Sequence, residues 1–146
     1  MATDIELSFP GGKRVDARVG DLVVSTDQPL DAGGQGSAVA PFDLFLASLA
    51  TCAGYYVLAF CQARGLSTEG LAMRQHVELD ERTKMPSRIR ISIRLPASFP
   101  DHLRVAVVRA AEACKVKKSI AAQPLIEVDV LPASAGLAQA PASTSP

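Results

Sequence analysis

PFDLFLASLATCAGYYVLAFCQARG, from Pro41 to Gly65, is the stretch that decides the fold. Proline suits the first turn of a helix, where its missing N–H has no partner to lose. A glycine at the other end is typical of a helix stop. Between them, residues 44–63 are a run of twenty without a formal charge. The pattern therefore predicts one long central helix that the rest of the chain buries.

The same run has the length of a membrane-spanning helix. It contains serine, threonine, glutamine, glycine and two tyrosines, and much of the remainder is alanine. No basic cluster flanks it, although membrane helices typically carry one. We therefore expect a buried helix and no membrane partner.

Strand-like segments precede the helix. Apolar and polar residues alternate over Ile5–Phe9, and the turn signal Pro-Gly-Gly follows. Two more strands are expected over Lys13–Val19 and Leu22–Thr26, which gives an antiparallel meander. Residues 29–38 then form a glycine-rich loop that leads into the helix.

The second half repeats this order of strands and helix. Met73–Leu79 and Ile89–Leu95 alternate and are joined by a polar connection, so they predict a hairpin. FPDHLRVAVVRAAEACKVKKSI, over Phe99–Ile120, predicts a second helix, and Leu125–Leu131 predicts a final strand. The expected fold class is α+β.

Composition limits the class of protein. The 146 residues suit one domain, which we place at 1–131, and the small, proline-rich residues 132–146 predict a disordered tail. Fifteen basic and fifteen acidic side chains cancel, so nothing draws the whole chain toward nucleic acid or anionic lipid. Three cysteines without a CxxC motif, and an N-terminus unlike a signal peptide, favour a reducing cytoplasm.

The cysteines are the candidate chemical groups. Cys52 and Cys61 lie nine residues apart on the expected central helix, on opposite sides and about 13 Å apart along its axis. A disulfide needs Cα atoms within about 7 Å, so Cys114 is the only plausible partner within the chain for either. Geometry alone does not choose between the two. Free cysteines are also often plain core residues, and this interpretation stays open.

Other chemistries have less support. His76, in an expected strand, and His102, at a helix start, make no ligand spacing with a cysteine, so no metal is expected. The lysines at 115, 117 and 118 are typical cations of a helix C-terminus. The loop sequence GGQG lacks the spacing of a phosphate-binding motif.

Taken together, the glycine-rich loop, PFDLFLASLATC, the long helix ending in RGL, and AAEACKVKKSI resemble the OsmC/Ohr superfamily of osmotically inducible and organic hydroperoxide resistance proteins. The resemblance covers residues 4–131. It implies curved antiparallel sheets wrapped around two long central helices, and an intertwined homodimer with active sites at the subunit interface. It implies no metal or organic cofactor.

The resemblance also implies roles for individual residues. Cys52 matches the peroxidatic cysteine, which becomes a sulfenic acid, and Cys114 matches the resolving cysteine, which closes a disulfide. A thiol or dihydrolipoyl donor would restore the pair. Cys61 matches no functional position. Because only the thiolate is nucleophilic, and burial alone would raise its pKa, Cys52 needs a cation nearby.

Peroxidase members supply that cation as an arginine, held by a glutamate early in the central helix. Arg14, just after the Pro-Gly-Gly turn, is the candidate here, ahead of Lys13 and Arg18. The glutamate position is occupied by Phe42, and Asp43 follows one residue later, about 100° around the helix. Asp43 would either orient Arg14 or only favour the helix start.

We therefore expect a cytoplasmic thiol-dependent peroxidase whose small-molecule substrate is an organic hydroperoxide. An apolar lining from Phe42, Phe45 and Leu49 would favour alkyl or aryl hydroperoxides over hydrogen peroxide. The alternative is a module without turnover that senses redox state or binds an apolar ligand in the same pocket, since fold does not fix function. A third interpretation is a structural protein with inert cysteines.

Overall fold

The computed structural model describes residues 4–136 of the chain, and a three-stranded antiparallel sheet opens the fold. Its strands, in sheet order, are β1 (Glu6–Gly11), β2 (Arg14–Val19) and β3 (Leu22–Thr26). Leu7 pairs with Ala17 and Ala17 with Val24, so these apolar side chains share one face. The three strands expected from the alternation are confirmed, with ends that differ by two residues at most.

A polar anchor organises the loop between this sheet and the first helix. Asp27 is buried, and its carboxylate accepts hydrogen bonds from the backbone N–H groups of Gln28 (2.8 Å), Gln35 (3.3 Å) and Ser37 (3.0 Å) and from the Ser37 hydroxyl (2.6 Å). These bonds to the charged form lower the pKa of Asp27 to about 2. The chain also turns so tightly that any Cβ on Gly34 would collide with the carbonyl of Gln28.

The central helix α1 (Pro41–Ala63) has the bounds that the sequence predicts. Proline occupies its first turn, and Gly65 follows its end with a φ of 61°. One side of the helix is buried, with Leu49, Ala53, Val57, Phe60 and Cys61. By length and composition α1 could cross a membrane (mean hydropathy 1.8), a property that the core helix of a soluble protein shares.

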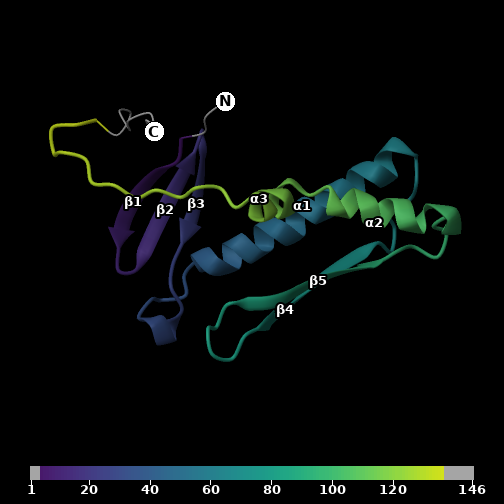
Figure 1. Cartoon of the computed structure of the whole chain (residues 1–146), viewed down its shortest axis with the longest axis horizontal. Coiled ribbons are helices and arrows are strands. Elements are labelled where there is room, and N and C mark those ends of the chain that lie inside the picture. Colours follow the sequence, from purple (N-terminus) through teal and green to yellow (C-terminus); the bar gives the residue numbers. More distant parts are fainter. Residues whose placement is uncertain (1–3, 137–146) are drawn as a thin grey trace.

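A two-stranded hairpin underlies α1 (Figure 1). Strands β4 (Ala72–Leu79) and β5 (Pro86–Arg94) pair antiparallel, with Gln75 opposite Ile91. The side chains of Ile89, Ile91 and Ile93 are half-buried and point toward the helices. The expected hairpin is confirmed, and α1 covers its apolar face.

The second helical region differs from the expectation of one continuous helix. It consists of a 3₁₀ turn (Asp101–Leu103), α2 (Arg104–Glu112) and α3 (Lys115–Ala122). Cys114 has a non-helical backbone (φ −44°, ψ 121°), which ends the helical path after Ala113. Cys114 therefore lies at the N-cap of α3 and not inside a helix. The break is stabilised locally, since the thiol accepts a hydrogen bond from the N–H of Lys117, as an N-cap side chain does.

The expected final strand, Leu125–Leu131, was wrong for the single chain. This segment has no regular secondary structure and pairs with no strand of the described residues. Because a strand is held by a neighbour's N–H and C=O groups, alternation alone cannot make one. Of the expected disordered tail at 132–146, residues 132–136 contain a turn, and the rest lies outside the described residues.

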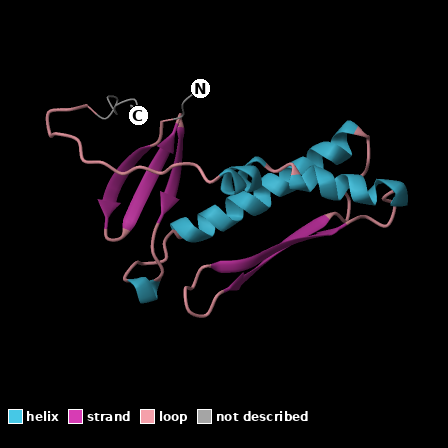
Figure 2. Ribbon diagram, viewed as in Figure 1, coloured by secondary structure: helices cyan, strands magenta, loops and turns pink. Residues whose placement is uncertain are grey.

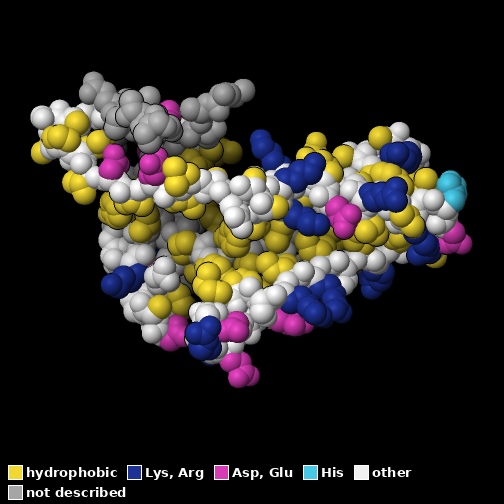
Figure 3. Space-filling view, viewed as in Figure 1, with side chains coloured by type: hydrophobic (Ala, Val, Ile, Leu, Met, Phe, Trp, Pro, Cys, Tyr) yellow, Lys and Arg dark blue, Asp and Glu magenta, His cyan; other side chains and the backbone are white. Residues whose placement is uncertain are grey.

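The helices and the hairpin form one body, and the β1–β3 sheet lies beside it (Figure 2). Two adjoining buried clusters make the core. Val57, Phe60, Cys61, Phe99 and Val107 form one, and Leu49, Ala53 and Cys114 form the other. Large apolar side chains remain exposed on the β1–β3 sheet and on α1, and Figure 3 shows a broad apolar hollow between these parts. A single chain thus leaves much of its apolar surface uncovered.

Candidate active site

The structure brings Cys52 and Cys114 together. Cys52 lies half-buried in the middle of α1, and it packs against the cluster of Leu49, Ala53 and Cys114. Cys114 reaches this place because the chain breaks between α2 and α3 and turns its side chain toward α1. Its thiol donates to the carbonyl of Leu49 (Sγ–O 3.8 Å) and accepts from the N–H of Lys117 (3.4 Å). Both cysteines are free thiols here.

The surroundings lower the pKa of Cys52. The backbone N–H of Val116 is the main cause, and burial opposes it. The thiol of Cys114, the N–H of Lys115 and the positive charge of Lys115 add to the lowering. The first turn of α3 therefore presents unpaired N–H groups to this sulfur, as helix N-termini do to anions.

The pKa of Cys114 shifts the other way. Burial raises it, and the neighbouring Cys52 raises it further, while the N–H groups of Lys117 and Val116 oppose the rise. In a pair of interacting thiols, only one ionises readily. Of the two, Cys52 is therefore the thiol whose pKa the surroundings lower, and Cys114 is the one whose pKa they raise.

Cys61 is separated from this chemistry. It is fully buried in the other core cluster, beside Val57 and Val107. Burial raises its pKa, with a smaller opposing effect from Arg64. The structure thus distinguishes Cys52 from Cys61, which helix geometry alone could not do.

The structure does not bring Arg14 to the cysteines within one chain. Arg14 lies in β2, and its guanidinium binds Asp16 (3.0 Å) and Ser25 (3.5 Å), while its Nε is buried without a hydrogen-bond partner. The other candidate cations, Lys13 and Arg18, belong to the same β1–β2 hairpin. No arginine is among the groups that shift the pKa of Cys52.

Asp43 and two of the three residues expected to line a pocket are exposed near the start of α1. Asp43 is exposed in the first turn of α1. Phe42 stacks on Phe45 with ring centroids 6.1 Å apart, and both are about 40% exposed. Of the three residues expected to line a pocket, only Leu49 does so in one chain.

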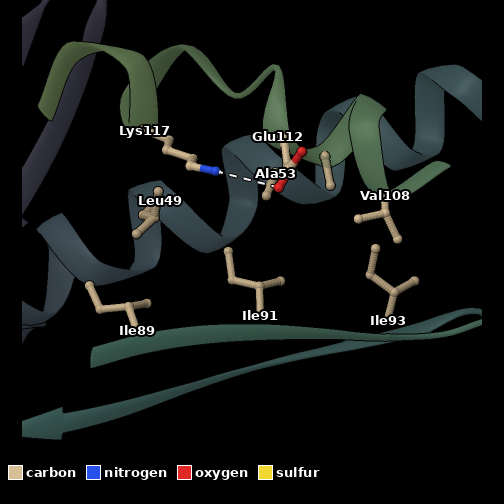
Figure 4. Close-up of a pocket in the computed structure, with 9 residues that line it drawn as sticks. Leu49, Ala53, Ile89, Ile91, Ile93, Val108, Glu112 and Lys117 are labelled. Atoms are coloured by element: carbon tan, nitrogen blue, oxygen red, sulfur yellow. Dashed lines mark ion pairs between the residues drawn. The ribbon is translucent and has the colours of Figure 1, made fainter. Parts of the chain in front are cut away.

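The pocket is an apolar cavity of about 370 Å³ beside the cysteine pair (Figure 4). Side chains from α1, β5, α2 and α3 line it, namely Leu49, Ala53, Ile89, Ile91, Ile93, Val108, Ala111, Glu112 and Lys117. Lys117 and Glu112 form an ion pair at 3.8 Å and are its only charged groups. Its volume falls in the range of small-molecule sites.

Sequence reasoning missed the role of α3 in this site. The N–H groups of Lys115 and Val116 face Cys52 only because the helix breaks after Ala113, and AAEACKVKKSI has no glycine or proline to signal a break. The ion pair of Lys117 with Glu112 was missed for the same reason. His76 and His102 are both exposed, away from the cysteines.

Solved structures of other proteins share this fold. A crystal structure from Psychrobacter arcticus 273-4, described as a putative osmotic stress induced and detoxification response protein, is 23% identical, with 82% of this chain and 88% of that one covered and a TM-score of 0.68. The OsmC-like protein of Mycoplasma pneumoniae is 12% identical, with 84% and 89% covered and a TM-score of 0.66. An organic hydroperoxide resistance protein OsmC of Legionella pneumophila is 22% identical, with 82% and 89% covered and a TM-score of 0.52.

The comparison with curated proteins gives no match. The model of the OsmC-like protein family matches residues 34–129, which include the second half of the glycine-rich loop, both cysteines of the pair and the hairpin between them. The resemblance that the two cysteine segments indicated is thereby confirmed, and this chain belongs to the OsmC-like protein family.

Proposed function

We propose that this protein is a thiol-dependent peroxidase that reduces organic hydroperoxides in defence against oxidative stress. The observation that carries the proposal is the pair of opposite pKa shifts at one place, which favours a thiolate at Cys52 and a thiol at Cys114. Such a peroxidase needs a nucleophilic thiolate beside a second sulfur that can resolve the oxidised one. Membership of the family, and relatives described as organic hydroperoxide resistance proteins, support the class of reaction.

The reaction would proceed in two steps. The Cys52 thiolate attacks one oxygen of the hydroperoxide, so that an S–O bond forms, the O–O bond breaks, and the alcohol leaves after its oxygen takes up a proton. Cys52 is oxidised to a sulfenic acid by two electrons. The sulfur of Cys114 then attacks it, a disulfide forms, and water leaves. A thiol or dihydrolipoyl donor would return the two electrons through a mixed disulfide.

The apolar cavity supports an organic substrate. Five aliphatic side chains from α1 and β5 face it, so the alkyl or aryl group of an organic hydroperoxide would be buried there. Hydrogen peroxide has no apolar group and would gain no binding free energy from this burial. We therefore expect a higher kcat/KM for cumene hydroperoxide than for hydrogen peroxide. Equal values for the two substrates would contradict this part of the proposal.

Arg14 and Asp43 would act at the cysteine pair only in a homodimer. In the single chain Arg14 is held in the β1–β3 sheet, apart from α1, so it could assist Cys52 only if two subunits pack together. Arg14→Ala should then slow oxidation of Cys52, whereas Arg18→Ala on the same strand should leave it unchanged. We place the reaction in the cytoplasm, where thiol donors are abundant.

The first experiment titrates the reduced protein with one equivalent of cumene hydroperoxide, then counts free thiols and maps disulfides. Wild type and Cys61→Ala should lose two thiols and yield a Cys52–Cys114 link. Cys52→Ser should keep its thiols, and Cys114→Ser should stop at a sulfenic acid that dimedone traps. Full turnover in Cys52→Ser would rule out the mechanism.

The alternative is a redox-sensing or ligand-binding protein without turnover. The cavity of about 370 Å³ favours it, because the cavity could hold an apolar ligand whether or not the cysteines react. With a dithiol donor in excess, one equivalent of alcohol per chain would indicate sensing, and many equivalents would indicate catalysis.

A further inference from the structure

The apolar cavity beside the cysteines has one charged side. Lys117 of α3 and Glu112 of α2 form their ion pair at 3.8 Å there, and Figure 4 shows the two side chains meeting on the side opposite the isoleucines of β5. Every other lining residue is a leucine, alanine, isoleucine or valine. A long apolar wall with one polar end fits an amphipathic ligand, because the two parts of such a ligand need different surroundings.

The ion pair can be exchanged for a ligand. The side chains of Lys117 and Glu112 are 57% and 60% exposed, so water screens their attraction and the pair contributes little to stability. Among residues 4–136 the Lys117 ammonium and the Glu112 carboxylate bind only each other. The fold therefore does not depend on this pair, and a charged ligand can take the place of either half.

The surrounding charge favours an anion over a cation. Residues 104–118, which include α2 and the first half of α3, carry five basic side chains and one acidic one, Glu112. This follows a division along the whole chain, since acidic residues predominate over residues 4–43 and basic residues over 72–122. A cavity lined with this sign of charge attracts anions. The ligand therefore replaces Glu112, and the flexible stem of Lys117 can follow it.

We propose that this cavity binds a medium-chain alkyl carboxylate, with its chain against the aliphatic wall and its carboxylate on Lys117 in place of Glu112. The volume of about 370 Å³, at about 30 Å³ for each water-sized group, suits a chain of about eight carbons. The ligand carries no peroxide and needs no reaction at the cysteines. The site is thus independent of the proposed peroxidase.

The test uses octanoate on the full chain with its thiols reduced, and isothermal titration calorimetry measures the dissociation constant. Octanol and octylamine are probes with the same chain and a different head group. Lys117→Met removes the cation but keeps the backbone N–H that binds the sulfur of Cys114. Glu112→Gln removes the competing carboxylate. Lys118→Met is the matched control, because it removes the same charge on the same helix from a side chain outside the cavity.

Wild type should bind one octanoate per chain, and hexanoate about tenfold more weakly, since two fewer methylenes are buried. Lys117→Met should weaken octanoate binding by about fivefold and leave octanol unchanged. Glu112→Gln should strengthen octanoate binding, because the competitor for Lys117 is gone. Lys118→Met should match wild type. Val108→Trp, which fills the cavity, should abolish the binding of both probes, and circular dichroism checks that each variant is folded.

Absence of octanoate binding would overturn the proposal. So would an equal loss in Lys117→Met and Lys118→Met, an equal loss for octanol, or octanoate binding that persists in Val108→Trp. Octylamine binding more tightly than octanoate would make Glu112 the ligand-binding group instead and contradict the assignment. Cys52→Ser should bind octanoate as wild type does while losing its reaction with cumene hydroperoxide, so the two proposals can fail separately.

Discussion

At the residue scale, the decisive feature is the contact of Cys52 with the first turn of α3. Lys115 contributes both its N–H and its charge to the lowered pKa. Lys115→Ala should remove only the charge, and Lys115→Pro should also remove the N–H, since Cys114 (ψ 121°) has a backbone that tolerates a following proline. The pKa of Cys52 should rise in the order wild type, Ala, Pro.

This order is measured by the rate of alkylation against pH. Because the thiolate is the reacting form, Cys52 of each variant should be alkylated more slowly than that of wild type at pH 7 and should recover the wild-type rate at higher pH. Loss of the Lys115 charge, at a helix end, should lower the rate at pH 7 by about two- to fivefold. Lys118→Ala, which loses a charge in the next turn, is the matched control. Identical profiles for all variants would mean that α3 does not activate Cys52.

A second prediction at this scale concerns Asp27. Its folded pKa of about 2 lies below the ordinary 3.8, so its stabilising bonds are fully present above about pH 4 and are lost as pH falls toward 2. Asp27→Asn should therefore lower the free energy of unfolding at pH 7, and the deficit should shrink as the pH approaches 2. Urea denaturation at several pH values measures it, and a deficit that is constant with pH would contradict the role of the charge.

Sequence reasoning identified Cys52 and Cys114 because they stand in two segments that resemble a known family. It could not identify the N–H of Val116, because a backbone group has no signature in the sequence. Its position depends on a break after Ala113 that local preference does not indicate.

At the element scale, α2 is held by one fully buried side chain. Val107 is 0% exposed against α1, whereas Val105 on the same helix is 64% exposed. Val107→Ala should lower the free energy of unfolding by about 1.5–3 kcal/mol, through lost burial and the cavity left behind. Val105→Ala should change it by less than about 0.5 kcal/mol. Similar losses for the two variants would show that α2 does not pack in this way.

The elements with strong periodicity were predictable. Ile89, Ile91 and Ile93 alternate strictly, and the hairpin follows. Pro41 and Gly65 mark the start and the stop of the central helix in the sequence, and α1 runs from Pro41 to Ala63. Apolar and acidic residues also alternate over 125–131, but this segment forms no strand. A strand needs a neighbouring strand to pair with, and the alternation of one segment does not show whether such a neighbour exists.

At the scale of the whole molecule, the exposed apolar surface predicts that folding and association are linked. If two copies bury the faces of α1 and the β1–β3 sheet, the unfolding temperature should rise by several degrees over about a hundredfold range of protein concentration. Differential scanning fluorimetry and calorimetry at matched heating rates measure it. A constant unfolding temperature would mean that the single chain is the stable folded unit.

The separation of charge along the chain has a further consequence for association kinetics. A protein with no net charge is usually expected to associate at a rate that depends little on salt. Here residues 4–43 carry seven acidic and three basic side chains, whereas residues 72–122 carry eleven basic and five acidic ones. If two copies associate as proposed, this division of charge should turn them toward an orientation in which opposite charges face each other. This steering acts over the Debye length, about 30 Å at 0.01 M salt and about 8 Å at 0.15 M. The rate of any such association should therefore fall as salt is added, although the protein has no net charge.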